Sequence, residues 1–282
     1  MNTSHERRLT ADGTTLGVTT LHGEGNPLIA LHGFTGAGVT MQPLVEAVRD
    51  GRPALLIDCI GHGSSDAPTN VEPYSMNSVV DQVLSIIGQQ PPGSVHLLGY
   101  SMGGRIALSM AARAPWYFAS LTILSATPGL VDPGERATRH EADLALADLI
   151  ESEGVEAFCD WWLDLPLFAP MVAGLSGEEL AATKAQRVAS TAIGLANSLR
   201  GTGTGAMPPV WQMLGSLRSP LLTVGGELDE AYVDIAERTA AAAPFGRSAV
   251  IPAAGHALHV ENLDAVSHLV REFLEGCDTA TP

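Results

Sequence analysis

The chain has 282 residues, of which 45% are hydrophobic, and it carries a formal net charge of −16 at pH 7. This length and hydrophobic content are sufficient for one large α/β domain with an inserted segment. The strongly negative charge disfavours nucleic acid and anionic membrane surfaces as partners, and an anionic substrate would have to be held by locally placed arginines.

Neither a secretion signal nor a membrane span is predicted. No basic segment followed by an apolar stretch opens the chain, and no apolar run approaches about 18 residues. We therefore expect a cytoplasmic protein that does not insert into membranes. The three cysteines, Cys59, Cys159 and Cys277, lack the spacing of a zinc site or a disulfide framework. We expect no metal and no cofactor, and the oligomeric state is left open.

The first part of the chain has the pattern of a sheet. Residues 6–22 are predicted to form an antiparallel hairpin that turns at Ala11-Asp12-Gly13. Short apolar runs then alternate with helical patterns up to about Ser125, as a parallel sheet with right-handed crossovers requires. The predicted strands of this part are 28–31, 54–58, 95–98 and 121–124.

The strand 28–31 runs into the loop His32-Gly33-Phe34-Thr35-Gly36. Its glycines allow backbone N–H groups to point into a cavity, and we expect the N–H groups of Phe34 and Met102 to form an oxyanion hole. His32, in this loop, and His62, after the strand 54–58, are interpreted as residues that shape their loops.

The strand 95–98 leads into Gly99-Tyr100-Ser101-Met102-Gly103, which a helical pattern follows. A serine in such a strand-to-helix turn requires flanking glycines, because a Cβ at either place would collide with the neighbouring strand or helix. The turn lifts the Ser101 hydroxyl above the sheet edge and aims the helix N-terminus at negative charge that forms there. Ser101 is therefore the candidate nucleophile or base.

After the strand 121–124 the alternation of strands and helices stops. Residues 127–217 have helical patterns with Pro and Gly breaks and no β-rich run. We predict a helical cap at 127–216 that covers Ser101, with the α/β core formed by 1–126 and 217–282. The helical segments expected in the cap are 135–152, 155–163, 177–190 and 193–200.

The sheet is predicted to resume at Pro220, with a strand at 221–224 followed by Gly225-Gly226-Glu227-Leu228-Asp229. A further strand at 250–252 leads to His256, and a helix at 263–274 ends the fold. Asp229, at the tip of its loop, is preferred as the acid over Glu227 and Asp234. His259 is expected to pack behind the site.

The order serine, aspartate, histidine along the chain is that of α/β-hydrolases rather than of trypsin-like or subtilisin-like enzymes. Each candidate follows the carboxyl end of a predicted parallel strand, where open α/β sheets place their sites. The sequence therefore predicts an α/β-hydrolase fold, with a mostly parallel sheet, helices on both faces and the triad Ser101, Asp229 and His256.

Several segments resemble the family of 2-succinyl-6-hydroxy-2,4-cyclohexadiene-1-carboxylate synthases of menaquinone biosynthesis, the MenH family. The similarity covers about residues 25 to 275. The segments that carry it are GYSMGGR (99–105), PGL (128–130), ERATR (135–139), FCDWW (158–162), LPLF (165–168) and LRGTGTGA (199–206). The arginine after the glycines and the cap segments are its specific part, because G-x-S-x-G is common to the superfamily.

The resemblance implies an elimination rather than a hydrolysis, in which a ring proton is removed and pyruvate leaves. Ser101 would be the base, His256 would take the proton, and Asp229 would hold the imidazole in its working tautomer. The small-molecule substrate carries several carboxylates, which guanidinium groups suit. The resemblance implies that the residues binding it are Arg105, Arg139, Arg187, Tyr100 and Trp161.

The residues themselves support this in part. Arg105 is predicted in the first helical turn, where a cation opposes the helix dipole, and this favours a functional role. Two other readings stay open: a hydrolase of an ester or a carbon–carbon bond, and a ligand-binding protein without catalysis. The run Gly201–Gly205 does not follow a strand, and Pro208-Pro209 prevents the helix that a dinucleotide site needs.

Overall fold

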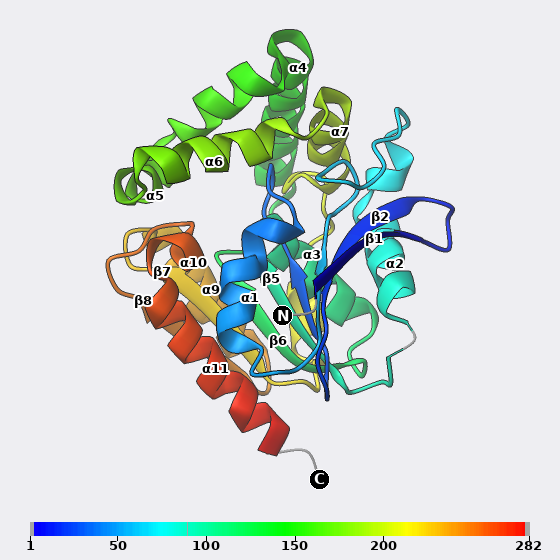
Figure 1. Ribbon diagram of the computed structural model, residues 1–282, viewed down its shortest axis with the longest axis vertical. Coiled ribbons are helices and arrows are strands. Elements are labelled where there is room, and N and C mark those ends of the chain that lie inside the picture. Colours follow the sequence, from blue (N-terminus) through cyan, green and yellow to red (C-terminus); the bar gives the residue numbers. More distant parts are fainter. Residues whose placement is uncertain (1–2, 89, 280–282) are drawn as a thin grey trace.

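The computed structural model describes residues 3–88 and 90–279, which form a sheet covered by helices (Figure 1). The described part of the chain contains one eight-stranded sheet with the order β1-β2-β4-β3-β5-β6-β7-β8. β1 and β2 form an antiparallel hairpin, β2 pairs antiparallel with β4, and the remaining pairs are parallel. The strands are β1 (Thr3–Leu9), β2 (Thr15–Leu21), β3 (Leu28–Leu31), β4 (Ala54–Ile57), β5 (Val95–Tyr100), β6 (Phe118–Leu124), β7 (Leu221–Gly226) and β8 (Gly246–Ile251).

The central strands are continuous apolar runs because both faces of the sheet are covered. Every residue of β3 and β4 is buried, as expected for parallel strands between two helical layers. On one face α2 and α3 pack against the sheet, and on the other α1 and α11 do so. The helices of these layers and of the loops are α1 (Gln42–Val48), α2 (Met76–Ile87), α3 (Met102–Arg113), α8 (Trp211–Leu214), α9 (Glu230–Ala242), α10 (Leu258–Glu261), α11 (Leu263–Thr279), η1 (Gly38–Met41) and η2 (Glu72–Tyr74).

The chain between β6 and β7 is helical and lies over one edge of the sheet (Figure 1). Its elements are α4 (Pro133–Leu163), η3 (Pro166–Phe168), α5 (Ala169–Gly174), α6 (Gly177–Val188) and α7 (Ala192–Thr202). α4 and α7 pack together around a small core of their own, which includes Ile150, Phe158 and Leu195. We call α4 to α7 the helical segment.

The sequence-based prediction of an α/β-hydrolase fold is confirmed, and the elements differ from it in detail. α4 is interrupted at Gly154, where φ is 82° and ψ is 166°, and its two parts correspond to the predicted helices 135–152 and 155–163. Residues 166–174, for which no helix was predicted, form η3 and α5. β8 begins at Gly246, whereas the predicted strand begins at residue 250. The prediction misses the first residues because this edge strand is mostly exposed and lacks an apolar pattern.

Within residues 3–88 and 90–279, no helix has the length and apolar character needed to cross a bilayer.

Candidate active site

Ser101 occupies the turn between β5 and α3 with a strained backbone. Its φ is 50° and its ψ is −109°, a region that residues with a side chain rarely adopt. The Ser101 N–H donates to the carbonyl oxygen of Leu124, 2.9 Å away on the neighbouring strand, and this bond fixes the turn to the sheet.

The two glycines of the motif have no room for a side chain. A Cβ added at Gly99 would lie 2.4 Å from the carbonyl oxygen of Gly103, and one at Gly103 would lie 2.2 Å from that of Leu31. Both contacts are with backbone that cannot move aside. A side chain at either position would therefore collide with backbone, as the motif predicts.

A hydrogen-bonded chain joins Ser101 to His256 and His256 to Asp229. Ser101 Oγ lies 3.0 Å from His256 Nε2, and His256 Nδ1 lies 2.8 Å from Asp229 Oδ2. A carboxylate oxygen only accepts, so Nδ1 carries the proton and Nε2 is free to accept from the serine hydroxyl. We call these three residues the relay.

The two alternative acids have other partners. Glu227 accepts from the N–H of Ala253 at 2.7 Å, and Asp234 accepts from Arg238 at 3.0 Å on the surface of α9. Neither carboxylate bonds to His256. The geometry therefore agrees with the preference for Asp229 as the acid of the relay.

The His256 imidazole is held from several sides. His256 is 3% exposed, and the rings of Tyr232, Tyr100 and Phe168 lie with centroids 4.7, 5.7 and 6.2 Å from its ring. Its backbone is fixed by Glu261, whose carboxylate accepts from the N–H groups of both neighbours of His256, Gly255 and Ala257. One side chain thus braces the loop that carries the histidine.

The loop after β3 lies against Ser101. A Cβ at Gly33 would be 3.5 Å from the Cβ of Ser101, and both Phe34 and Met102 line the same cavity as the serine. Met102 is the first residue of α3, so its N–H has no acceptor within the helix. These positions suit the predicted oxyanion hole.

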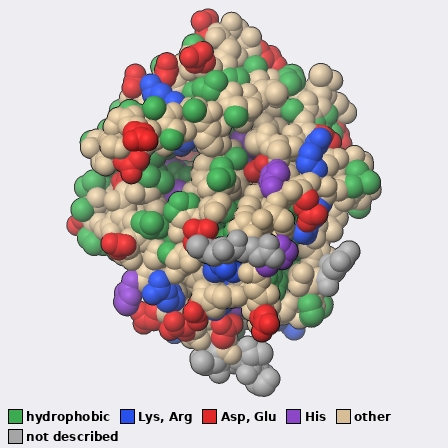
Figure 2. Space-filling view, in the orientation of Figure 1, with side chains coloured by type: hydrophobic (Ala, Val, Ile, Leu, Met, Phe, Trp, Pro, Cys, Tyr) green, Lys and Arg blue, Asp and Glu red, His purple; other side chains and the backbone are tan. Residues whose placement is uncertain are grey.

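A cavity of about 620 Å³ lies between the sheet edge and the helical segment, and Ser101 and His256 line it. The space-filling view shows a hollow on this side of the molecule, bordered by hydrophobic side chains (Figure 2). Exposed hydrophobic residues that line the cavity are Val39, Leu167 and Val260. Acidic side chains are spread over the visible face, whereas the cavity contains arginines.

Arg105 and Arg139 line one part of this cavity. Arg105 donates to the carbonyl oxygen of Thr202 on α7, and burial lowers the pKa of Arg105 to about 10, so it remains charged at neutral pH. Arg139 Nε donates to Asp143 at 2.8 Å, and its side chain is 44% exposed. Asp143, fully buried, also accepts from the N–H of Gly205 at 3.0 Å.

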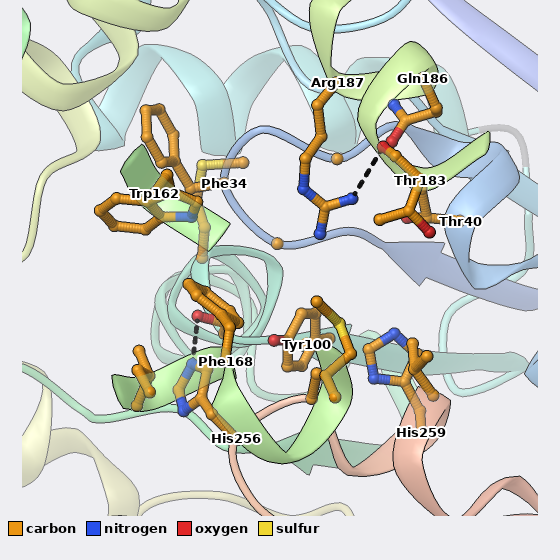
Figure 3. Close-up of a pocket in the computed structure, with 18 of the residues that line it drawn as sticks. Phe34, Thr40, Tyr100, Trp162, Phe168, Thr183, Gln186, Arg187, His256 and His259 are labelled. Atoms are coloured by element: carbon orange, nitrogen blue, oxygen red, sulfur yellow. Dashed lines mark hydrogen bonds between the residues drawn. The ribbon is translucent and has the colours of Figure 1, made fainter. Parts of the chain in front are cut away.

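Arg187 reaches the cavity from α6. In the close-up its guanidinium points into the space between Trp162 and Thr40 (Figure 3). One of its terminal nitrogens donates to the carbonyl oxygen of Thr183 at 3.3 Å, and its Nε has no partner. Burial lowers the pKa of Arg187. Tyr100 also lines the cavity as the resemblance implies.

The expected role of Trp161 in the pocket is corrected by the structure. It was expected to line the pocket, but its side chain is 42% exposed, and its neighbour Trp162 faces the cavity instead. Consecutive residues of a helix point about 100° apart, so only one of the two rings can face inward. Trp162 packs against Phe34 and Phe168, with centroids 5.5 and 5.7 Å away.

Several residues of the cavity were not predicted as site residues, among them Gln186, Tyr232 and His259. Gln186 precedes Arg187 on α6, and Tyr232 lies one helical turn after Asp229. His259 was expected only to pack; its ring does pack on Tyr100 at 4.3 Å, and it also lines the cavity. Tyr232 and His259 each follow a relay residue by three positions, and this closeness in the chain was the available signal for them.

His32 and His62 shape their loops as expected. His32 Nε2 accepts from the N–H of Cys59 at 3.0 Å, and its Nδ1 lies 2.8 Å from the carbonyl oxygen of Gly33. Burial lowers the pKa of His32, and that of His62 to about 3.

A parallel sheet of this order, with serine, aspartate and histidine following β5, β7 and β8, defines the α/β-hydrolase fold. Residues 26–147 match the family described as alpha/beta hydrolase fold. Within it, the chain is 31% identical over 248 residues to the 2-succinyl-6-hydroxy-2,4-cyclohexadiene-1-carboxylate synthase of Photorhabdus laumondii, covering 88% of this chain and 84% of that one. A Bacillus subtilis (strain 168) protein that carries the same name provisionally is 39% identical over 247 residues, 88% and 89% of the two chains.

Among solved structures, MenH from S. aureus superposes with a TM-score of 0.86 at 30% identity, covering 93% of this chain and 98% of that one. The chain belongs to the 2-succinyl-6-hydroxy-2,4-cyclohexadiene-1-carboxylate synthase family. The resemblance found in the sequence is thereby confirmed.

Proposed function

We propose that this protein is a 2-succinyl-6-hydroxy-2,4-cyclohexadiene-1-carboxylate synthase of menaquinone biosynthesis, a lyase that eliminates pyruvate from a cyclohexene bearing succinyl and enolpyruvyl groups. The observation that carries the proposal is the opening of a complete serine–histidine–aspartate relay into a cavity lined by three arginines. Identity to the named synthases over most of the chain supports the choice of reaction.

In this reaction Ser101 is the base. As its oxygen takes the ring proton, the serine proton passes to His256 Nε2, 3.0 Å away. The electron pair of the C–H bond becomes the new ring double bond, and the ring C–O bond breaks. The leaving oxygen departs as the enolate of pyruvate, which takes up the proton held by His256, so that the relay returns to its starting state. Asp229 stabilises the imidazolium through the bond to Nδ1.

The oxyanion hole and the arginines supply the remaining electrostatics. Enolate charge that forms on the substrate during proton removal is stabilised by the N–H groups of Phe34 and Met102. Arg105, Arg139 and Arg187 bind the carboxylates, because guanidinium groups match their planar geometry. Tyr100 and Trp162 form apolar walls, and residues 127–216 act as the cap that closes over the small polycarboxylate.

The same relay could also hydrolyse an ester or a carbon–carbon bond, as the sequence left open. Such a substrate would leave the arginines of the cavity without an anion to bind, and Arg105 and Arg187 bond to backbone carbonyl oxygens rather than to carboxylates. The arginines therefore favour the elimination over the hydrolase reading.

The test is to incubate the purified protein with the cyclohexene substrate and follow diene absorbance together with released pyruvate. We expect the two products in equal amounts, and none with Ser101→Ala. Absence of diene, combined with rapid turnover of simple aryl esters by the wild type, would instead identify a hydrolase.

A further inference from the structure

Tyr232 lines the cavity, and the fold makes no use of its hydroxyl. Among the four tyrosines of the chain, Tyr74 and Tyr117 donate to backbone carbonyl oxygens that lie 3.0 and 2.6 Å away. Within residues 3–88 and 90–279 the hydroxyls of Tyr100 and Tyr232 have no such acceptor, and both side chains line the cavity. The resemblance accounts for Tyr100, whereas Tyr232 has no role so far.

The hydroxyl of Tyr232 is open to the cavity. Some polar atoms of the described residues are fully covered by protein and have no partner, as Trp162 Nε1 does. The Tyr232 oxygen is not one of these covered atoms, and its side chain forms part of the cavity surface. A phenol offers both a donor and an acceptor. The bonding capacity of this hydroxyl is therefore available to whatever occupies the cavity.

The aromatic ring of Tyr232 is fixed beside the relay. Tyr232 lies in the first turn of α9, where its N–H donates to the carbonyl oxygen of Asp229 at 3.0 Å. Its ring meets that of His256 edge to face, with centroids 4.7 Å apart and an interplanar angle of 66°. The start of α9 is held against β7, because a Cβ added at Gly225 would lie 2.9 Å from the backbone of Val233. These contacts together fix the position of the phenol.

The hydroxyl end of Tyr232 lies within the electrostatic reach of Arg105 and Arg139. Burial raises the pKa of Tyr232, and the two guanidinium charges oppose that rise without cancelling it. The phenol therefore keeps its proton at neutral pH and can donate a hydrogen bond. One side chain thus connects the part of the cavity beside the relay with the part that holds two cations.

The proposed substrate has an oxygen at the corresponding place. An ether oxygen joins the enolpyruvyl group to the ring, and the carboxylate of this group is attached one carbon beyond that oxygen. The ring must reach Ser101 to lose its proton, while the carboxylate requires a guanidinium. With the ring at the relay and the carboxylate at Arg105 or Arg139, the ether oxygen lies between them, as the Tyr232 hydroxyl does.

We propose that the Tyr232 hydroxyl donates a hydrogen bond to the ether oxygen of the enolpyruvyl group and stabilises this oxygen as it leaves. The assignment deepens the proposed function and rests on it for the identity of the leaving group. When the ring C–O bond breaks, its electron pair stays on the oxygen, and the hydrogen bond strengthens as this charge develops. Tyr232 keeps its own proton, because the enolate takes up the proton held by His256.

Tyr232→Phe tests the assignment, because it removes the hydroxyl and keeps the ring that packs on His256. We expect kcat for diene formation to fall about 10- to 100-fold, the effect of losing a hydrogen bond to a charged group, with KM changed less than about twofold. Hydrolysis of a neutral aryl ester by the same relay should be unchanged, since the ester has no enolpyruvyl oxygen.

Tyr117→Phe is the matched control. It removes a hydroxyl that bonds to the backbone carbonyl of Ile87 and does not line the cavity, so it should keep the kcat of the wild type. Thermal unfolding of both variants checks that they are folded.

Binding of two acids of the same shape tests the contact without turnover. Cyclohexyloxyacetate has an ether oxygen one carbon from its carboxylate, and 3-cyclohexylpropanoate has a methylene group in place of that oxygen. In calorimetry the wild type should bind the ether acid about fivefold more tightly, the effect of one hydrogen bond. Tyr232→Phe should reduce this preference to about twofold or less.

Equal binding of the two acids by the wild type would overturn the assignment, and so would a kcat of folded Tyr232→Phe within about twofold of the wild type. A rise in KM alone, or an equal loss of ester hydrolysis, would also overturn it, because the hydroxyl would then act in binding or through the relay. If the wild type forms diene, these results refute only the role of Tyr232. A wild type that prefers the ether acid through Tyr232 but forms no diene refutes only the proposed function.

Discussion

The relay differs from the wall that α6 contributes to the cavity, which includes Gln186 and Arg187, in how its polar groups are hydrogen-bonded. Ser101, His256 and Asp229 bond to one another, and Glu261 fixes the backbone on both sides of the histidine. In the wall, Gln186 and Arg187 each keep a buried atom without a partner. The hydrogen bonds of the relay are complete within the protein, whereas two polar atoms of the wall have no partner in it. Changes in the first should therefore affect the chemical step, and changes in the second the recognition of substrate.

The largest effect is expected in the relay. Ser101→Ala and His256→Ala should each lower kcat by about 10³- to 10⁶-fold with folding intact, and Asp229→Asn somewhat less, because the chain of proton transfer is broken. Diene formation in steady-state assays measures this. Glu227→Gln is the matched control, since its carboxylate bonds to the Ala253 N–H and not to His256. Activity of Asp229→Asn within tenfold of the wild type would move the acid role elsewhere.

Substitution of the cavity arginines should have the next largest effect. Arg105→Ala and Arg187→Ala should each lose about 30-fold to several-thousandfold in kcat/KM, as expected when a charged hydrogen-bonded contact is removed. Arg105→Lys should retain only part of the kcat/KM that Arg105→Ala loses, because an ammonium lacks the planar geometry of a guanidinium. Arg139→Ala should lose less, since this arginine is 44% exposed and already bonds to Asp143.

A neutral aryl ester provides the control for the arginine variants, because it offers no carboxylate. We expect the wild type and the arginine variants to hydrolyse it slowly and at similar rates. An equal loss of both activities would mean that the arginines support the fold rather than recognise the substrate.

Glu261→Gln separates positioning of the histidine from binding. The glutamine places an NH₂ group against one of the two backbone N–H groups that now donate to the carboxylate. Two donors cannot bond to each other, so the loop that carries His256 shifts. We expect kcat to fall about tenfold, with KM changed less than twofold. Glu272→Gln on the exposed surface of α11 is the control. A rise in KM without a change in kcat would contradict a positioning role.

The two adjacent tryptophans give a smaller contrast. Trp162→Ala removes a ring that lines the cavity and should raise KM by about tenfold or more, whereas Trp161→Ala should leave KM within about twofold. Steady-state kinetics of both variants decide it. The reverse order would return Trp161 to the pocket.

The smallest expected effect is on the pH dependence of the free energy of unfolding. Burial lowers the pKa of His62 and of His259 to about 3, below the value of about 6.5 in an unfolded chain. Below about pH 6.5 the unfolded state therefore binds more protons, and the free energy of unfolding decreases as pH falls. Each histidine contributes at most about 1.4 kcal/mol per pH unit. Urea unfolding between pH 7.5 and 5 should show a shallower decrease for His259→Phe than for the wild type; equal slopes would rule out a buried neutral imidazole.

The relay could be predicted from the sequence because its constraints are local. Gly99 and Gly103 lie in one short motif, although the collision at Gly103 is with the backbone of Leu31 on β3, and each relay residue follows a recognisable strand. The wall could not be predicted in the same way. The inward face of α6 is polar and has no buried residue, so no apolar stripe marks it. Whether Trp161 or Trp162 faces inward depends on the rotation of α4, which packing against α7 decides.

The position of the helical segment has a consequence for how this fold diversifies. All three relay residues lie in loops after β5, β7 and β8, whereas Gln186, Arg187 and Trp162 belong to a single excursion between β6 and β7. That excursion has a small core of its own around Phe158. Apart from Phe168, whose ring packs on His256, its residues can therefore change without disturbing proton transfer, and natural selection can exchange one substrate for another while the reactive centre is inherited unchanged.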